Sequence, residues 1–162
     1  YSVPGRSVVE ISPETTARLA ADCPNVIAIK EAGGSVDRIN QLVQAVPENF
    51  TILSGDDQLT LPFISSGATG LVSVAANIIP DVMARIVRAC LNGSFNEALE
   101  LQKKYYPLMR GLMTLDVNPV PIKSAVALQG HCLPELRLPL APLTSEASAK
   151  LGTLLDSYNL LS

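Results

Sequence analysis

Short apolar runs alternate along the first part of the chain with segments of helical periodicity, repeating every ~20 to 25 residues. The runs that indicate strands are Val26–Ile29, Thr51–Leu53 and Leu71–Val74. Helices are predicted from about Gln58 after the second run and from about Pro80 after the third. This alternation is typical of repeated βα units whose parallel strands form a buried sheet. We count three complete units.

Local signals mark the first two helices. Ser12 is expected to cap a helix that has Pro13 in its first turn, and Ser35 is expected to cap the helix after the first strand. The expected apolar positions are Leu19 and Ala20 in the first helix and Ile39, Leu42 and Val43 in the second.

The pattern changes after residue 93. Ser94 and Glu97 form a predicted capping box at the head of a long amphipathic helix. Further helices are predicted over about Pro121–Leu128 and Ser145–Leu160, with a proline-rich loop between them. We therefore divide the chain into βα units over residues 1–93 and a helical extension over residues 94–162.

The predicted fold class is α/β, the C-terminal part of a (β/α)8 barrel followed by an all-helical tail. A complete barrel needs roughly 250 residues, and three or four βα units cannot close a ring of parallel strands. The first residue is Tyr1, and no strand is predicted before the first helix. We expect the chain to be a fragment, or one of two pieces of a cleaved subunit.

Composition narrows the class of protein. Hydrophobic residues make up 48% of the 162 positions and charged residues only 17%, which favours a barrel wall or an oligomer interface. The net charge of -3 gives no reason to expect a nucleic-acid partner. No apolar run is long enough to span a bilayer, and no signal peptide is recognisable, so we expect a cytoplasmic protein with no membrane partner.

Cysteine and histidine offer little chemistry. Cys23, Cys90 and Cys132 are scattered, which predicts reduced, buried thiols rather than disulfides or a zinc site. The single histidine, His131, is interpreted as structural. We expect no metal site.

Lys30 ends the strand run Val-Ile-Ala-Ile, on the same side as Ala28, so it is expected at the carboxyl-end mouth where parallel-barrel active sites are built. Apolar surroundings favour the uncharged amine, which is the form that attacks a ketone. The alternative is a lysine that merely ends a strand and pairs with Glu31.

Tyr1 and Arg6 lie one βα unit upstream, in Tyr-Ser-Val-Pro-Gly-Arg. A loop at the same mouth could carry a proton-transferring phenol and a carboxylate-binding guanidinium. The alternative, favoured by the residues alone, is a turn with solvated ends.

Gly55, Asp56 and Asp57 follow the second strand. Their carboxylates could bind a metal or act as acid and base, but capping of the helix near Gln58 is the favoured interpretation. The spacing of Gly67 and Gly70 does not match a dinucleotide or phosphate loop.

Together these residues resemble the dihydrodipicolinate synthase and N-acetylneuraminate lyase group of pyruvate-dependent class I aldolases, over nearly the whole chain. The motifs of this chain are more similar to those of the synthases than to those of the sugar-acid lyases. The segments that carry the resemblance are Tyr1–Arg6, Ile29–Ala32, Ser54–Asp57, Gly70–Asn77, Asn118–Lys123 and Leu136–Leu143.

The resemblance implies that Lys30 forms a Schiff base with pyruvate, Tyr1 relays protons and Arg6 steers the carboxylate of the second substrate, L-aspartate 4-semialdehyde. The backbones at Gly55 and Val72 would line the pyruvate pocket. The implied product is 4-hydroxy-tetrahydrodipicolinate, made in lysine biosynthesis without a cofactor. The implied partners are the missing N-terminal half of the same subunit and further subunits of a homotetramer.

Some positions depart from the common pattern of the group. Gly33 and Ala75 stand where threonine is frequent, and Val72 stands where isoleucine is frequent. None of these changes removes a catalytic group.

Two other functions stay open. A related aldolase would cleave a sugar acid or 4-hydroxy-2-oxoglutarate with the same lysine and tyrosine. A non-catalytic half-barrel would only pair with another subunit.

Overall fold

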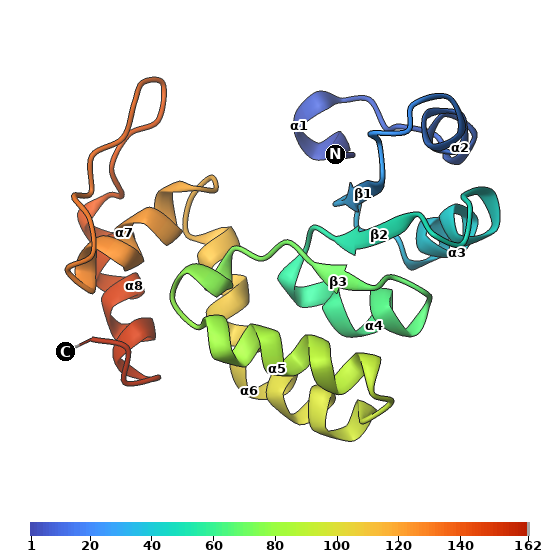
Figure 1. Ribbon diagram of the computed structural model, residues 1–162. Helices are drawn as coiled ribbons and strands as arrows, with labels where there is room; N and C mark the ends of the chain where they lie inside the picture. Colours follow the sequence, from blue (N-terminus) through green and yellow to red (C-terminus); the bar gives the residue numbers. More distant parts are fainter. Residues whose placement is uncertain (162) are drawn as a thin grey trace.

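The computed structural model describes residues 1–161, in which a three-stranded parallel sheet is ordered β1-β2-β3 (Figure 1). The strands are β1 (Ala28–Glu31), β2 (Thr51–Ser54) and β3 (Gly70–Leu71). In the register of the sheet, Lys30 pairs with Leu53 and Leu53 pairs with Gly70. The predicted α/β class and the three parallel strands are confirmed.

The strand bounds differ from the prediction at both outer strands. β1 begins at Ala28 instead of Val26 and runs through Lys30 to Glu31, because Ile27 is 69% exposed and only its carbonyl joins the ladder, accepting from the Thr51 N–H. β3 is shorter than Leu71–Val74, since the chain turns away after Leu71. Strand pairing also extends to Ser2, which forms a parallel bridge with Glu31 where no strand was expected.

Helix α2 (Pro13–Asp22) precedes β1, α3 (Val36–Ala45) and α4 (Thr60–Ser65) separate the strands, and α5 (Pro80–Leu91) follows β3. Both predicted serine caps are confirmed, since the Thr15 N–H donates to Ser12 Oγ and the Arg38 N–H donates to Ser35 Oγ. The expected apolar face of α2 is only partly correct, because Leu19 is exposed and Thr16 is the buried residue of this helix.

The two faces of the sheet have different surroundings. Ile29, Glu31, Ile52 and Ser54 point to one face and are buried. The alternate residues of β1 and β2, Lys30 among them, are only partly buried. A closed parallel barrel covers both faces. The half-covered face, which carries Lys30, is therefore the face that would point into the interior of a barrel.

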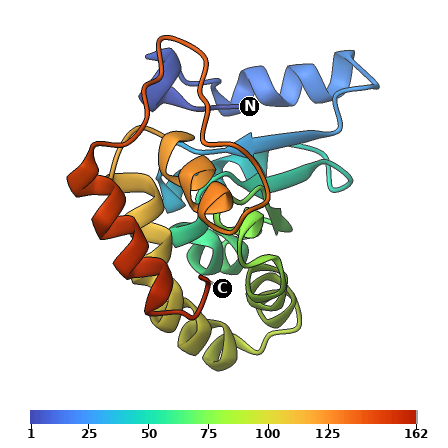
Figure 2. The ribbon, with the colours of Figure 1, turned by 90° about the vertical axis from the view of Figure 1, so that its left-hand side faces the viewer.

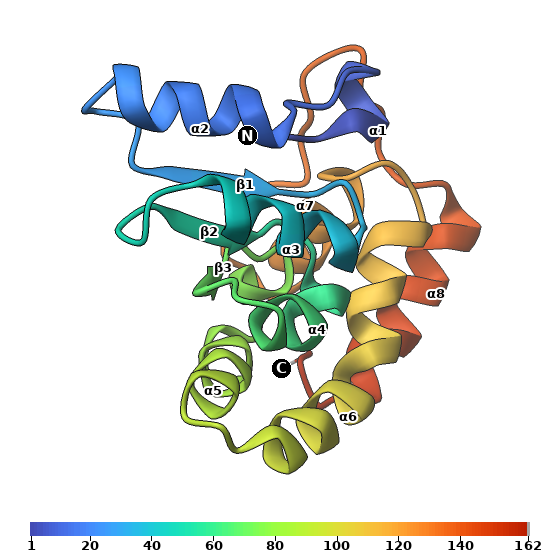
Figure 3. The same ribbon diagram turned by 90° about the vertical axis from the view of Figure 1, so that its right-hand side faces the viewer.

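The chain after residue 93 is helical, as predicted. It contains α6 (Phe95–Thr114), α7 (Val120–Leu128) and α8 (Ser145–Asp156). Short 3-10 turns follow two strands, η1 (Asp57–Leu59) after β2 and η2 (Ala75–Asn77) after β3. Because α6 packs on η1 and α7 packs on η2, the helical tail lies at the carboxyl ends of the strands, as Figures 2 and 3 also show.

The predicted capping box at the start of α6 is wrong. Ser94 makes no side-chain cap, and the Glu97 carboxylate instead accepts from Arg85 Nε at 2.6 Å. The partner on α5 competes for this carboxylate and draws it away from its own helix end. The last helix also ends at Asp156 rather than near Leu160 as predicted. Three residues after this end, Asn159 adopts a positive φ of 54°, which is not helical.

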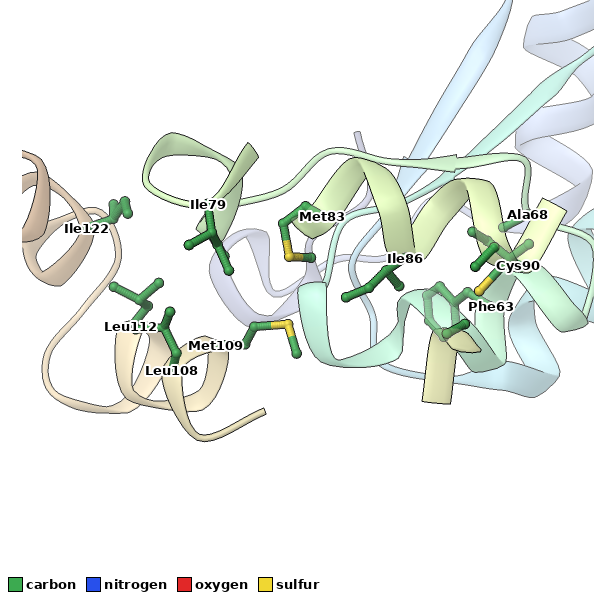
Figure 4. Packing of buried hydrophobic residues seen from close by; sticks show 14 of the residues in the cluster. Phe63, Ala68, Ile79, Met83, Ile86, Cys90, Leu108, Met109, Leu112 and Ile122 are labelled. Carbon is green, nitrogen blue, oxygen red and sulfur yellow. The ribbon is translucent and has the colours of Figure 1, made fainter. Parts of the chain in front are cut away.

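One hydrophobic cluster joins helices α4 and α5 of the βα units to helix α6 of the helical tail (Figure 4). Phe63 of α4 and Met83 and Ile86 of α5 share this cluster with Leu108 and Met109 of α6. These side chains are at most 2% exposed. Packing of this kind is the main stabilising term for the helices, and it fixes the tail relative to the sheet.

Candidate active site

The five residues of interest from the sequence lie around the carboxyl ends of the strands. Gly55 follows β2 and donates its N–H to the Glu31 carbonyl at 2.8 Å. Val72 follows β3 and donates its N–H to the Ser54 carbonyl at 2.8 Å. These two bonds continue the ladder beyond the strand ends, so the loop after β2 starts beside the end of β1 and the loop after β3 starts beside the end of β2.

Lys30 lies on the half-covered face of β1, on the side of Ala28, as predicted. Its Nζ atom is 4.0 Å from the centroid of the Tyr1 ring. The alternative, a pair with Glu31, is wrong. Strand alternation turns Glu31 to the opposite face, where it is fully buried and accepts from Arg38 Nε at 2.8 Å.

Tyr1 reaches Lys30 because the backbone beside it joins the sheet. The Ser2 N–H donates to the Lys30 carbonyl, and the Ala32 N–H donates to the Ser2 carbonyl, each at 2.9 Å. The Tyr1 side chain is 61% exposed and covers the amine from the open side. The extended pairing of Ser2, which sequence reasoning missed, is what brings the phenol to the lysine.

Arg6 lies in the short helix α1 (Pro4–Ser7), so the segment is more ordered than the predicted turn. Its Nη2 donates to the Asn118 carbonyl at 2.6 Å, across 112 positions of sequence. This bond joins the Tyr1–Arg6 segment to the loop before α7. Two motifs that are distant in the sequence therefore meet at one mouth.

Gly55 is required by the close approach of its loop to Lys30. A Cβ atom at this position would lie 2.8 Å from Ala32 Cβ and 3.0 Å from Lys30 Cε. Distances this short force backbone or side chain to move. Because Gly55 has no side chain, the aliphatic part of the Lys30 side chain can lie beside it without a steric clash.

Comparison with known proteins bears on this geometry. The model of the dihydrodipicolinate synthetase family matches residues 1–158. A 4-hydroxy-tetrahydrodipicolinate synthase of Aquifex aeolicus (strain VF5) is 41% identical over 160 residues, which are 99% of this chain and 54% of that protein. The Bacillus subtilis (strain 168) enzyme of the same name is 44% identical over 153 residues, 94% of this chain and 52% of that protein.

This chain belongs to the dihydrodipicolinate synthetase family.

Solved structures of the family agree in fold. The crystal structure of dihydrodipicolinate synthase from Aquifex aeolicus superposes with a TM-score of 0.96 at 41% identity, over 99% of this chain and 54% of that one. The 4-hydroxy-tetrahydrodipicolinate synthase from Methylacidiphilum fumariolicum SolV gives 0.90 at 48% identity, over 100% of this chain and 56% of that one. The chain spans about half the length of the relatives it matches, and its fold is part of their (β/α)8 barrel.

The two aspartates after Gly55 have separate roles. Asp56 Oδ1 accepts from the Gln58 N–H at 2.9 Å, which confirms the predicted cap. Asp57 Oδ2 accepts from the N–H groups of Val74 and Ala75, in the loop after β3. Burial raises the pKa of Asp57, an effect that the hydrogen bonds from the Ala75 and Val74 N–H groups oppose. This link between loops was not predicted, because its partners are remote in the sequence.

A buried ion pair lies behind β1. Arg38 Nε is 2.8 Å from Glu31 Oε2 and 3.1 Å from Glu10 Oε1, and Arg38 also donates to the Ile11 carbonyl. The Gly33 N–H donates to the other oxygen of Glu31 at 2.6 Å. The space beside Gly33 is filled by the carboxylates of Glu31 and Glu10, so the threonine frequent in the family would meet them here.

Residues 1–161 contain no cluster of side chains suited to a metal ion. Cys90 is a buried free thiol as expected, but Cys132 is exposed and Cys23 only partly buried. His131 is exposed in the turn after α7, where its backbone N–H donates to the Val126 carbonyl. Over the same described residues, no helix has both the length and the hydrophobicity needed to cross a bilayer.

A groove of about 490 Å³ runs beside β3. Its lining is mostly apolar and includes Leu53, Leu71, Met83 and Val87. Among the described residues, β3 pairs only with β2, so the groove follows the open edge of the sheet. Open edges of this type are pairing sites for a further strand.

Proposed function

We propose that this chain supplies the Schiff-base side of a 4-hydroxy-tetrahydrodipicolinate synthase, which condenses pyruvate with L-aspartate 4-semialdehyde in lysine biosynthesis. The observation that carries the proposal is the arrangement at the end of β1. There the Lys30 amine faces the Tyr1 ring at 4.0 Å, and Gly55 leaves room beside the lysine stem. The names of the relatives support the choice of reaction.

The reaction begins when the uncharged Lys30 amine attacks the ketone carbon of pyruvate and water leaves, giving an imine. Its positive nitrogen accepts electrons, so the methyl carbon loses a proton and becomes an enamine nucleophile. The enamine adds to the aldehyde carbon of the semialdehyde. Cyclisation through the substrate's amino group then releases Lys30, and the imine serves as the electron sink without a further cofactor.

Tyr1 and Arg6 have separate roles in this scheme. The Tyr1 phenol relays protons to and from the reacting carbon and oxygen atoms, because the ring already lies against the amine. The Arg6 guanidinium binds the carboxylate of the semialdehyde. One of its nitrogens is held by the Asn118 carbonyl, which orients the rest of the planar donor fork.

The pyruvate pocket is lined by backbone at Gly55 and Val72. Their N–H groups are engaged in the ladder with Glu31 and Ser54. The pocket is therefore lined by the remaining backbone atoms of these two residues. Small and apolar side chains here leave the lysine as the main reactive group.

The proposal includes a polypeptide that completes the barrel. The open edge of β3, the apolar groove beside it and the half-covered face of the sheet support this partner. A homotetramer stays a prediction. One similar structure, at 37% identity and a TM-score of 0.92, is described as the first monomeric dihydrodipicolinate synthase variant.

The test is borohydride reduction of the complete barrel in the presence of pyruvate, followed by mass spectrometry of the peptides. We expect a pyruvate-dependent adduct on Lys30 and pyruvate-dependent consumption of L-aspartate 4-semialdehyde. Release of pyruvate from a sugar acid or 4-hydroxy-2-oxoglutarate, without use of the semialdehyde, would assign the related aldolase reaction instead. A barrel that traps no pyruvate would be a non-catalytic member of the family.

A further inference from the structure

Asp57 joins the loop after β2, which starts beside the end of β1, to the loop after β3. Its Oδ2 atom accepts from the Val74 N–H at 3.1 Å and from the Ala75 N–H at 2.8 Å. The residue is 4% exposed, and Ala75 is fully buried. Loss of the carboxylate would therefore leave the buried Ala75 N–H without its acceptor, and an unpaired buried N–H is costly.

The location of this link gives it a consequence for the site. Pairing between β2 and β3 covers only Leu53 with Gly70 and Ser54 with Leu71, followed by the Val72 N–H to the Ser54 carbonyl. Beyond that bond, the next connection between the two loops is the Asp57 carboxylate. Gly55 and Val72 lie between the ladder and this carboxylate.

A carboxylate is well suited to accept hydrogen bonds from the N–H groups of Val74 and Ala75. Val74 and Ala75 start the 3-10 turn η2, and the free N–H groups of such a turn attract negative charge. One oxygen takes both donors, while Oδ1 is buried without a hydrogen-bond partner. Keeping a carboxylate in such a place costs solvation, which the two hydrogen bonds to Oδ2 offset in part.

We propose that Asp57 is a positioning residue for pyruvate: it fixes the backbone at Val72 relative to Gly55 and so sets the shape of the pocket beside Lys30. This inference rests on the proposed function, because the pocket is defined by pyruvate. Asp57 acts through the two loops and does not touch the substrate.

The adjacent Asp56 offers a matched control. It carries the same group, but its Oδ1 accepts only from the Gln58 N–H within its own turn. Asp56→Leu removes a carboxylate and a cap without touching the link between loops. Asp57→Leu removes the link, and Asp57→Asn keeps an amide oxygen that can accept from both N–H groups.

The experiment measures borohydride trapping of pyruvate by the complete barrel as a function of pyruvate concentration, for the unsubstituted protein and the three variants. We expect Asp57→Leu to raise the half-saturating pyruvate concentration about tenfold or more, the scale of a lost hydrogen bond to a charged group. The limiting rate of trapping should change much less. Asp57→Asn should give a smaller rise, and Asp56→Leu should leave the half-saturating concentration unchanged.

Hydrogen exchange of the peptide containing residues 72–77 provides a second measurement that does not depend on the leucine variant folding well. In Asp57→Asn this peptide should exchange faster than in the unsubstituted protein, while β1 and β2 keep their protection. Equal half-saturating concentrations in the unsubstituted protein and both Asp57 variants would overturn the positioning role, as would an equal rise in Asp56→Leu. Failure of the unsubstituted protein to trap pyruvate would overturn the proposed function itself.

Discussion

The Nζ atom of Lys30 lies 4.0 Å from the centre of the Tyr1 ring, so the amine faces the π surface of a phenol that a separate segment brings to the sheet. A contact of this kind between a cation and an exposed ring is worth about 0.5 to 1 kcal/mol. It holds the lysine side chain toward the mouth. The ring and its hydroxyl group can be tested separately.

Tyr1→Phe keeps the ring and removes the hydroxyl. We expect pyruvate still to be trapped, but about a hundredfold more slowly, because general acid–base catalysis contributes at least that factor. Tyr1→Ala should be slower still, since the ring contact with Lys30 is lost as well. The measurement is the rate of trapping at saturating pyruvate. An unchanged rate in Tyr1→Phe would remove the phenol from the mechanism.

Lys30→Ala should abolish pyruvate-dependent trapping. Lys123→Ala is the matched control. Lys123 lines a groove together with Pro119, the neighbour of Asn118, whose carbonyl accepts from Arg6. Unlike Lys30, Lys123 lies on helix α7 and not at the end of a strand. Mass spectrometry of the reduced peptides locates the adduct. A label on Lys123 or on another lysine would contradict the assignment of Lys30.

Arg6→Ala should weaken use of L-aspartate 4-semialdehyde more than use of pyruvate. Loss of a charge-assisted contact to a carboxylate raises the Michaelis constant for the semialdehyde about tenfold or more. Pyruvate is already held through its imine. Steady-state kinetics with each substrate varied in turn makes the comparison, and equal rises in both constants would argue against a steering role.

Residues 1–162 expressed by themselves should be poorly folded and inactive. The β3 edge is open, the groove beside it is apolar, and the inner face of the sheet is only half covered. Because a domain's net stability is only ~5 to 15 kcal/mol, losing the cover of such surfaces can exceed it. Circular dichroism and size-exclusion chromatography, with and without the rest of the barrel, test this. A monodisperse, cooperatively melting sample that traps pyruvate would show a self-sufficient half-barrel.

Asp57 should make stability depend on pH in a recognisable direction. Burial raises its folded-state pKa above the ordinary value of 3.8, so the folded protein holds this proton to higher pH than the unfolded chain does. The stabilisation is present below pH 3.8 and is lost as pH rises through the raised pKa. The free energy of unfolding of the unsubstituted protein, relative to Asp57→Asn, should therefore fall over this range and level off above it. Thermal unfolding of both proteins at a series of pH values measures the difference, and a rise instead of a fall would be inconsistent with the burial effect.

Much of the framework could be predicted because its causes are local in the sequence. Ser12, Ser35 and Asp56 each accept from an N–H two or three residues ahead, so spacing alone identifies them as caps. Apolar runs bounded by helical periodicity predicted three parallel strands, and one of them carries Lys30 to the mouth. Strand alternation placed Lys30 on the same side as Ala28.

Tertiary structure alone decided how these parts meet. Arg6 binds a carbonyl 112 positions away, Asp57 binds N–H groups 17 and 18 positions away, and Glu97 leaves its predicted cap for Arg85 on another helix. No spacing rule predicts such partners, because each is selected by the packing of separate elements and by the cost of leaving buried donors and acceptors unpaired. The sequence thus determined the strands, the caps and the candidate lysine, while packing determined which loops, ring and guanidinium surround that lysine.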